Sequence, residues 1–123
     1  MDILAMFSDA DKTEDYSKGT YIFHQDDPAA SMYVILEGEV DILLNNRVIA
    51  TLKPSYIFGE MALIDEGPRS ASAFAKTDCK LVPIDKENFL YLVQQTPYFA
   101  LHVMKTLSGK VRAVNKIISV KSE

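Results

Sequence analysis

The sequence predicts a mainly β fold, an antiparallel β barrel or jelly roll, with α-helices at its C-terminal end. Between residues 19 and 84, short segments rich in β-branched and aromatic residues follow one another closely, separated by turn residues. From Asp85 onward, the apolar residues recur at helical spacing instead. The chain has 123 residues, of which 48% are hydrophobic and 24% charged, so we expect one globular domain over residues 1–123.

The strands are predicted in order along the chain. Residues 1–18 are expected to form a lead-in, a short apolar turn or helix followed by the polar segment SDADKTEDYSKG. The segments TYIFH, MYVILEGEVDILL and RVIATL are typical of strands, and Gly38 allows a sharp corner within the second of them. The segment RSASAFAKTDCKLVPI predicts two further strands around a turn at Thr77-Asp78.

A β-hairpin is predicted around Asn45-Asn46. Asparagine tolerates the positive φ that a tight two-residue turn requires, and apolar residues alternate on both sides of the pair. The residues expected to share one face of this hairpin are Val40, Ile42, Leu44, Val48, Ala50 and Leu52.

Two helices are predicted over residues 85–118. Asp85 is a suitable N-cap for the first helix, and Thr96-Pro97 supplies a cap and an N-terminal proline for the second. An apolar stripe would follow the second helix through Phe99, Val103, Leu107, Val111, Val114 and Ile118.

Composition excludes several classes of protein. Cys79 is the only cysteine, so an internal disulfide is impossible, and a reducing compartment is the simpler interpretation. No signal peptide or membrane span is evident, which predicts a cytoplasmic protein. His24 and His102 stand in no metal-ligand spacing, and no catalytic constellation is evident, so we expect neither a metal site nor an enzyme.

The net charge of -4 is unevenly distributed along the chain. Residues 1–97 are acidic, whereas residues 98–123 hold five Lys and Arg against one acid. The basic tail indicates a solvated helix face or one docked on the acidic body; a nucleic-acid patch is the alternative, although an acidic body would repel DNA.

The segment between Leu52 and Ser70 is too long for a simple hairpin link, and long ordered loops are often functional. Residues 59–64 can form a short helical turn whose unpaired N–H groups favour an anion, and Gly59 leaves room for close approach. Gly67-Pro68 would return the chain so that the Arg69 guanidinium reaches a phosphate there. Alternatively, Glu60 complements the helix N-terminus and simply pairs with Arg69.

The stretch FGEMALIDEGPRSASAFA resembles the phosphate-binding cassette of the cyclic nucleotide-binding domain, the module of catabolite activator protein and protein kinase A regulatory subunits. The segment GTYIFHQDDPAASMYVILEGEVDI is similar to the first strands of this family, and the resemblance covers roughly residues 15–118. It implies a β jelly roll (double-stranded β-helix) over residues 19–84 with a short phosphate-binding helix. The cassette would occupy residues 58–71, and the two helices would follow.

The resemblance also implies roles for single residues. Glu60 would bind the ribose 2'-hydroxyl, and Arg69 would pair with the cyclic phosphate. Backbone N–H groups near Met61 and Ala62, together with the Ser70 hydroxyl and the Ala71 N–H, would complete the phosphate cradle. The final helix would close over the base as a lid, with candidate contacts from Val111, Arg112, Val114 and Asn115.

The chain departs from the family pattern at two places. Asp26 stands in the turn after the first strand, where the family often has glycine, and we expect a small cost because aspartate tolerates the left-handed conformation. The sequence also ends at Glu123, without a DNA-binding, kinase-inhibitory or channel segment. A homodimer or a separate effector protein is therefore expected as the partner.

Two functions are expected from these observations. The first is a sensor of cyclic AMP or cyclic GMP, with cyclic AMP favoured, which has no cofactor and responds by moving its C-terminal helix. The alternative is a ligand-free structural or dimerisation domain of the same fold, consistent with the apolar stripe of the last helix and the missing output segment.

Overall fold

The computed structural model describes residues 3–7, 9–64 and 67–106. The chain forms two compact units, residues 2–89 and a second unit that begins at Leu90. The elements in chain order are α1 (Ile3–Phe7), β1 (Glu14–Tyr16), β2 (Tyr21–Phe23), β3 (Ser31–Glu37), β4 (Val40–Leu44), β5 (Arg47–Leu52), β6 (Ile57–Phe58), α2 (Met61–Ile64), β7 (Ser72–Ala75), β8 (Cys79–Asp85) and α3 (Lys86–Gln95).

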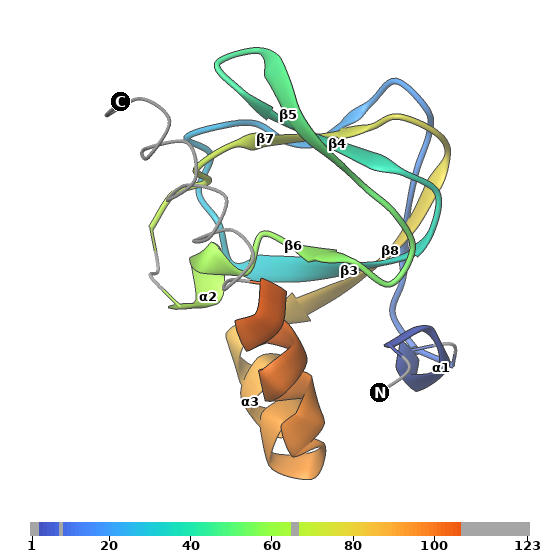
Figure 1. The fold of residues 1–123 in the computed structure, drawn as a ribbon, viewed down its shortest axis with the longest axis vertical. Coiled ribbons are helices and arrows are strands. Elements are labelled where there is room, and N and C mark those ends of the chain that lie inside the picture. Colours follow the sequence, from blue (N-terminus) through green and yellow to red (C-terminus); the bar gives the residue numbers. More distant parts are fainter. Residues whose placement is uncertain (1–2, 8, 65–66, 107–123) are drawn as a thin grey trace, which may run out of the picture. The chain divides into compact units, whose positions relative to one another are not determined.

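The eight strands form two four-stranded sheets that face each other (Figure 1). One sheet has the order β1-β8-β3-β6 and the other the order β2-β7-β4-β5. All recorded strand pairs are antiparallel, and many of them join strands far apart in the sequence, such as β1 with β8. The arrangement confirms the predicted antiparallel jelly roll.

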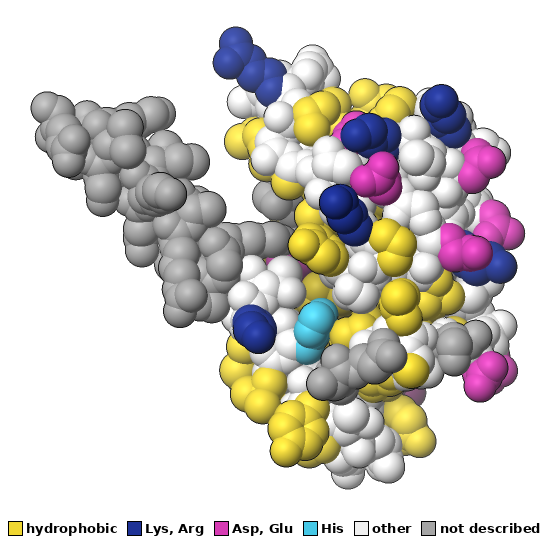
Figure 2. Space-filling view, turned by 45° about the vertical axis from the view of Figure 1, so that its right-hand side comes forward, with side chains coloured by type: hydrophobic (Ala, Val, Ile, Leu, Met, Phe, Trp, Pro, Cys, Tyr) yellow, Lys and Arg dark blue, Asp and Glu magenta, His cyan; other side chains and the backbone are white. Residues whose placement is uncertain are grey.

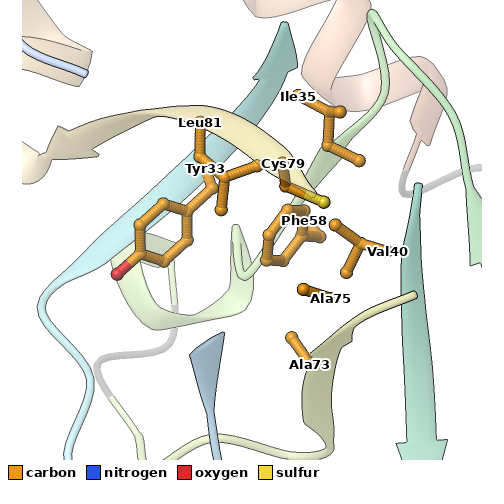
Figure 3. Packing of buried hydrophobic residues seen from close by; sticks show 8 residues of the cluster. All are labelled: Tyr33, Ile35, Val40, Phe58, Ala73, Ala75, Cys79 and Leu81. Carbon is orange, nitrogen blue, oxygen red and sulfur yellow. The ribbon is translucent and has the colours of Figure 1, made fainter. Parts of the chain in front are cut away.

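The main hydrophobic core lies between the two sheets. Side chains from strands of both sheets converge there (Figure 3). Its buried members are Tyr33, Ile35, Val40, Phe58, Ala73, Ala75, Cys79 and Leu81. The alternation of strand residues places these side chains inward, and Phe23 and Ile42 are among the half-buried residues that pack against them.

The predicted tight turns are confirmed. Asn45 and Asn46 have φ values of 51° and 66°, as a two-residue hairpin turn requires. Asp26 has a φ of 73°, so it occupies the left-handed conformation expected of it. At Gly38, with a φ of 90°, a Cβ would overlap the carbonyl oxygen of Asp78, and glycine is therefore required.

The predicted hairpin face is wrong at its tip. The register shifts between Ile42 and Leu43, so that Leu43 rather than Leu44 pairs with Val48, and Ile49 is the extra residue of a β-bulge. Val48 is consequently 56% exposed instead of lying on the inner face with Ala50 and Leu52. Two short strands are not predicted from the sequence, β1 within the polar lead-in and β6 within the long segment before Arg69.

The helical end of the chain matches the prediction as far as it is described. The Asn88 N–H donates to the Asp85 carboxylate at 2.8 Å, which confirms Asp85 as the N-cap of α3. A second helix includes residues 97–106, and its Phe99 and Val103 are buried. The remaining stripe positions and the lid candidates Val111, Arg112, Val114 and Asn115 lie outside the described residues. None of the described helices has the length and hydropathy needed to span a membrane.

Candidate functional site

The candidate site begins where β6 ends, at Gly59. Gly59 has a φ of 75°, which turns the chain out of the strand and into α2. The Ala62 N–H donates to the Gly59 carbonyl at 3.2 Å, and the Leu63 N–H donates to the Glu60 carbonyl at 3.1 Å. The short helical turn predicted for residues 59–64 therefore forms.

These hydrogen bonds change which of the predicted backbone N–H groups could bind a ligand. Because the Ala62 N–H is already bonded to Gly59, it is not directed at a ligand in this arrangement. No described residue accepts a hydrogen bond from the Met61 N–H, which makes Met61 the better-placed amide of the predicted pair.

Arg69 is held at its backbone by the turn that follows β2. The Arg69 N–H donates to the Asp27 carbonyl at 2.9 Å, and the Asp26 N–H donates to the Arg69 carbonyl at 2.8 Å. The turn itself is stabilised by the Asp27 carboxylate, which accepts a hydrogen bond from the His24 N–H at 2.9 Å. Two segments more than forty residues apart in sequence thus fix where the Arg69 side chain starts.

The Arg69 guanidinium extends to the α2 turn and lies on aromatic rings. Its Nη1 donates to the Gly59 carbonyl at 3.3 Å. Its Cζ lies 3.9 Å from the centroid of the Phe23 ring and 5.8 Å from that of Tyr33. Only 6% of Arg69 is exposed, so the cation is buried beside Gly59, as the sequence analysis predicted for its position.

Glycine at position 59 makes room for the guanidinium. A Cβ at this position would lie 2.7 Å from Nη1 of Arg69, far inside contact distance. The group that approaches Gly59 is therefore the Arg69 side chain, and not the ligand expected from the sequence.

The charge of Arg69 has no carboxylate partner in the described part of the chain. No described carboxylate oxygen lies within 4.0 Å of its nitrogens, so the expected alternative of an ion pair between Glu60 and Arg69 is not formed in this structure. The Arg69 Nε is buried and lacks an acceptor among the described residues. Burial lowers the pKa of Arg69, while the nearby Tyr33, Asp27 and Tyr16 oppose that shift.

The other predicted site residues are close neighbours of Gly59 or Arg69 in the sequence. Glu60 is 1% exposed and is the second buried charged residue described, one position before α2. Met61 is exposed and Ala62 is buried. Ser70 is exposed and Ala71 half-buried, and both lie between Arg69 and the first residue of β7.

The described residues show no sign of metal chemistry. No group of three or more His, Cys, Asp or Glu side chains among them could hold a metal ion. An open surface hollow of about 430 Å³ runs along β1 and β8; its lining includes Asp15, Glu37 and Lys80 and does not include Arg69. The predicted site around Arg69 is therefore not part of this hollow.

The comparison with protein families identifies the kind of domain that contains Glu60 and Arg69. Residues 13–96 match the model of the family described as the cyclic nucleotide-binding domain. The chain belongs to the cyclic nucleotide-binding domain family. The match contains the whole β2–β8 region with Glu60 and Arg69, and it ends before the helix that includes residues 97–106.

Known members of the family include regulators. The chain is 35% identical over 102 residues to the cyclic AMP receptor protein of Thermus thermophilus, covering 79% of this chain and 47% of that protein. It is 34% identical over 86 residues to a cAMP-dependent protein kinase regulatory subunit of Hypocrea atroviridis, covering 70% of this chain and 19% of the subunit. The chain thus spans less than half the length of these curated relatives.

A solved structure supports the same assignment of fold. The crystal structure of the Thermus thermophilus catabolite activator protein superposes on this cyclic nucleotide-binding domain with a TM-score of 0.82 at 32% identity. The superposition covers 90% of this chain and 55% of that one.

The Phe23 and Tyr33 rings lie near the Arg69 guanidinium, and the Asp27 carbonyl accepts the Arg69 N–H; none of the three residues is predicted as a site residue from the sequence. Tyr33 is also a core residue, since it is buried and stacks on Phe58 with ring centroids 5.3 Å apart. A pattern within β2 or β3 could not reveal their role, because their contact with Arg69 joins residues far apart in the sequence.

Proposed function

We propose that this domain binds a cyclic mononucleotide, cyclic AMP in first place and cyclic GMP in second, and acts as a cytoplasmic regulatory module rather than an enzyme. The observation that carries the proposal is the buried Arg69 guanidinium, which has no carboxylate partner among the described residues and lies against the α2 turn. A buried charge without a partner is costly, and a ligand phosphate would supply the missing one.

The ligand's charge and sugar fit the residues around Arg69. A 3',5'-cyclic phosphate carries one negative charge, which a single guanidinium can match. The Met61 N–H and the segment Ser70-Ala71 would bind the remaining phosphate oxygens. The Glu60 carboxylate would accept a hydrogen bond from the 2'-hydroxyl, which is the only free hydroxyl on the cyclic ribose phosphate.

The regulatory part of the proposal concerns the C-terminal helix. A ligand moves a helix only if it binds one arrangement better than the other, and we propose that contacts with the base provide that difference. Val111, Arg112, Val114 and Asn115 remain the candidate base contacts. The names of the relatives, a cyclic AMP receptor and a kinase regulatory subunit, support a regulator whose output lies in a partner or in another segment.

Calorimetric titration tests the site. Cyclic AMP should bind the wild type and bind Arg69→Ala and Glu60→Ala far more weakly, while adenosine 5'-monophosphate should bind poorly to all three. At a hundred times the dissociation constant, the ligand should stabilise the wild type by about 2.7 kcal/mol. Saturable cyclic AMP binding that Arg69→Ala leaves unchanged would refute the assigned site.

The second candidate function is a ligand-free structural or dimerisation domain. It is favoured by large apolar side chains that reach the surface, some of them visible in Figure 2. In the helical segment 97–106, Tyr98, Leu101 and Met104 are all more than half exposed. This candidate predicts no thermal shift with any cyclic nucleotide and an oligomer that depends on protein concentration.

A further inference from the structure

The Arg69 side chain is fixed by fewer polar contacts than a buried cation normally has. The Arg69 backbone is held by hydrogen bonds to the turn after β2, but its long side chain retains several rotatable bonds. The single recorded hydrogen bond from the guanidinium runs from Nη1 to the Gly59 carbonyl at 3.3 Å, which is long for a charged donor. Another contact must therefore set the orientation of the guanidinium.

The ring of Phe23 is that contact. Its centroid lies 3.9 Å from the Arg69 Cζ, well inside the distance of about 6 Å at which a ring attracts a cation. The Tyr33 ring, at 5.8 Å, lies near the limit of that range. Phe23 is the last residue of β2, immediately before the turn whose Asp26 and Asp27 hold the Arg69 backbone.

The Phe23 ring is itself anchored in the core. Its centroid lies 6.2 Å from that of Tyr33 and 6.0 Å from that of Phe58, and Tyr33 and Phe58 stack at 5.3 Å. Phe23 also pairs with Ala73 of β7 across the sheet. The three rings therefore form a support that is continuous with the core shown in Figure 3.

We propose that Phe23 is a positioning residue that holds the Arg69 guanidinium at the α2 turn while leaving its charge available to an anion. A carboxylate in the same place would neutralise the cation and compete with a phosphate. An aromatic face orients the cation by its quadrupole and offers no hydrogen-bond acceptor in the ring plane. The contact can be measured in the free protein, whereas its effect on ligand affinity rests on the proposed function.

Nuclear magnetic resonance of the free domain tests the contact itself. The ring current of Phe23 should shift the Arg69 side-chain protons upfield in the wild type and in Phe23→Tyr. Phe23→Leu should abolish most of that shift. Phe74→Leu is the matched control, because Phe74 is also half-buried and packs on Tyr21, yet it has no recorded contact with Arg69. An unshifted Arg69 in the wild type would overturn the proposal even if Phe23→Leu failed to fold.

Titration with cyclic AMP tests the consequence. Phe23→Leu should weaken binding by roughly 2- to 30-fold, the range of a cation–π contact, while Phe23→Tyr should stay within about twofold of the wild type. Phe74→Leu should bind as the wild type does. Equal affinity in Phe23→Leu and the wild type, or an equal loss in Phe23→Leu and Phe74→Leu, would overturn the positioning role.

The two proposals fail in different ways. If the wild type binds no cyclic nucleotide, the proposed function fails, and the resonances of Arg69 still decide whether Phe23 orients it. If the wild type binds tightly and Phe23→Leu loses the ring-current shift without losing affinity, the function stands and the positioning role is wrong.

Discussion

Replacing Gly59 by alanine should distinguish an effect on ligand affinity from an effect on the stability of the fold. Gly59 has a φ of 75°, and a left-handed conformation costs a residue with a Cβ about 1–2 kcal/mol. The new Cβ would also lie 2.7 Å from Nη1 of Arg69, although it would make only an ordinary contact, 3.5 Å, with the Ser31 carbonyl oxygen. The guanidinium is the end of a flexible side chain, so it would move and lose its place at the α2 turn.

The chain provides a matched control in Gly19. Gly19 has a φ of 88°, and a Cβ there would meet nothing within 4 Å. Gly19→Ala therefore carries the backbone strain without the displacement of a side chain. Both variants should lose about 1–2 kcal/mol of unfolding free energy, measured by urea denaturation.

Only Gly59→Ala should lose ligand affinity. Loss of one charge-assisted hydrogen bond costs about 1.5–3 kcal/mol, which corresponds to a roughly 10- to 150-fold increase in the Kd for cyclic AMP. The Kd of Gly19→Ala for cyclic AMP should stay within about twofold of the wild-type value, since this substitution leaves the position of Arg69 unchanged. If Gly59→Ala bound cyclic AMP as tightly as Gly19→Ala, the argument that Gly59 makes room for Arg69 would be refuted.

Further predictions concern the fold. Asp85→Ala should lower the unfolding free energy by about 1 kcal/mol because it removes the cap on the Asn88 N–H, while Asp85→Asn should retain most of it; equal losses would contradict the capping role. Gly38→Ala should destabilise the domain more than Gly19→Ala in the same urea assay, because its Cβ would overlap a backbone carbonyl oxygen. Burial raises the pKa of the Cys79 thiol, so iodoacetamide should label it slowly at pH 8 until urea unfolds the chain; fast labelling of the folded protein would contradict this. Burial and, second to it, the hydrogen bond to Glu14 raise the pKa of Tyr16. Above pH 10 the Tyr16 hydroxyl is therefore deprotonated in the unfolded state before it is deprotonated in the folded state, and the unfolding free energy should fall as the pH rises. Tyr16→Phe should make that fall shallower.

Features that depend on neighbouring residues could be predicted from the sequence. The Asn45-Asn46 turn and the Asp85 cap are decided within a few residues, by the backbone preferences of asparagine and the reach of a carboxylate. The left-handed conformation of Asp26 belongs to the same class. The succession of short strands was also enough to predict an antiparallel β barrel or jelly roll.

Features that depend on distant partners could not be predicted. The polar residues of β1 form a strand because they pair with β8, where Glu14 lies opposite Leu81. The bulge that exposes Val48 is decided where two strands meet, not by the alternation of apolar residues within either one. The predicted site residues Glu60 and Arg69 come from one stretch of sequence, whereas Phe23 joins them only through the fold.

A structure of the domain crystallised with cyclic AMP is the most direct test of the proposed ligand site. We expect the cyclic phosphate to lie against the Arg69 guanidinium and the start of α2, with the ribose 2'-hydroxyl at Glu60 and the Phe23 ring beneath the guanidinium. A nucleotide bound elsewhere, or an Arg69 side chain turned away from the phosphate, would contradict it.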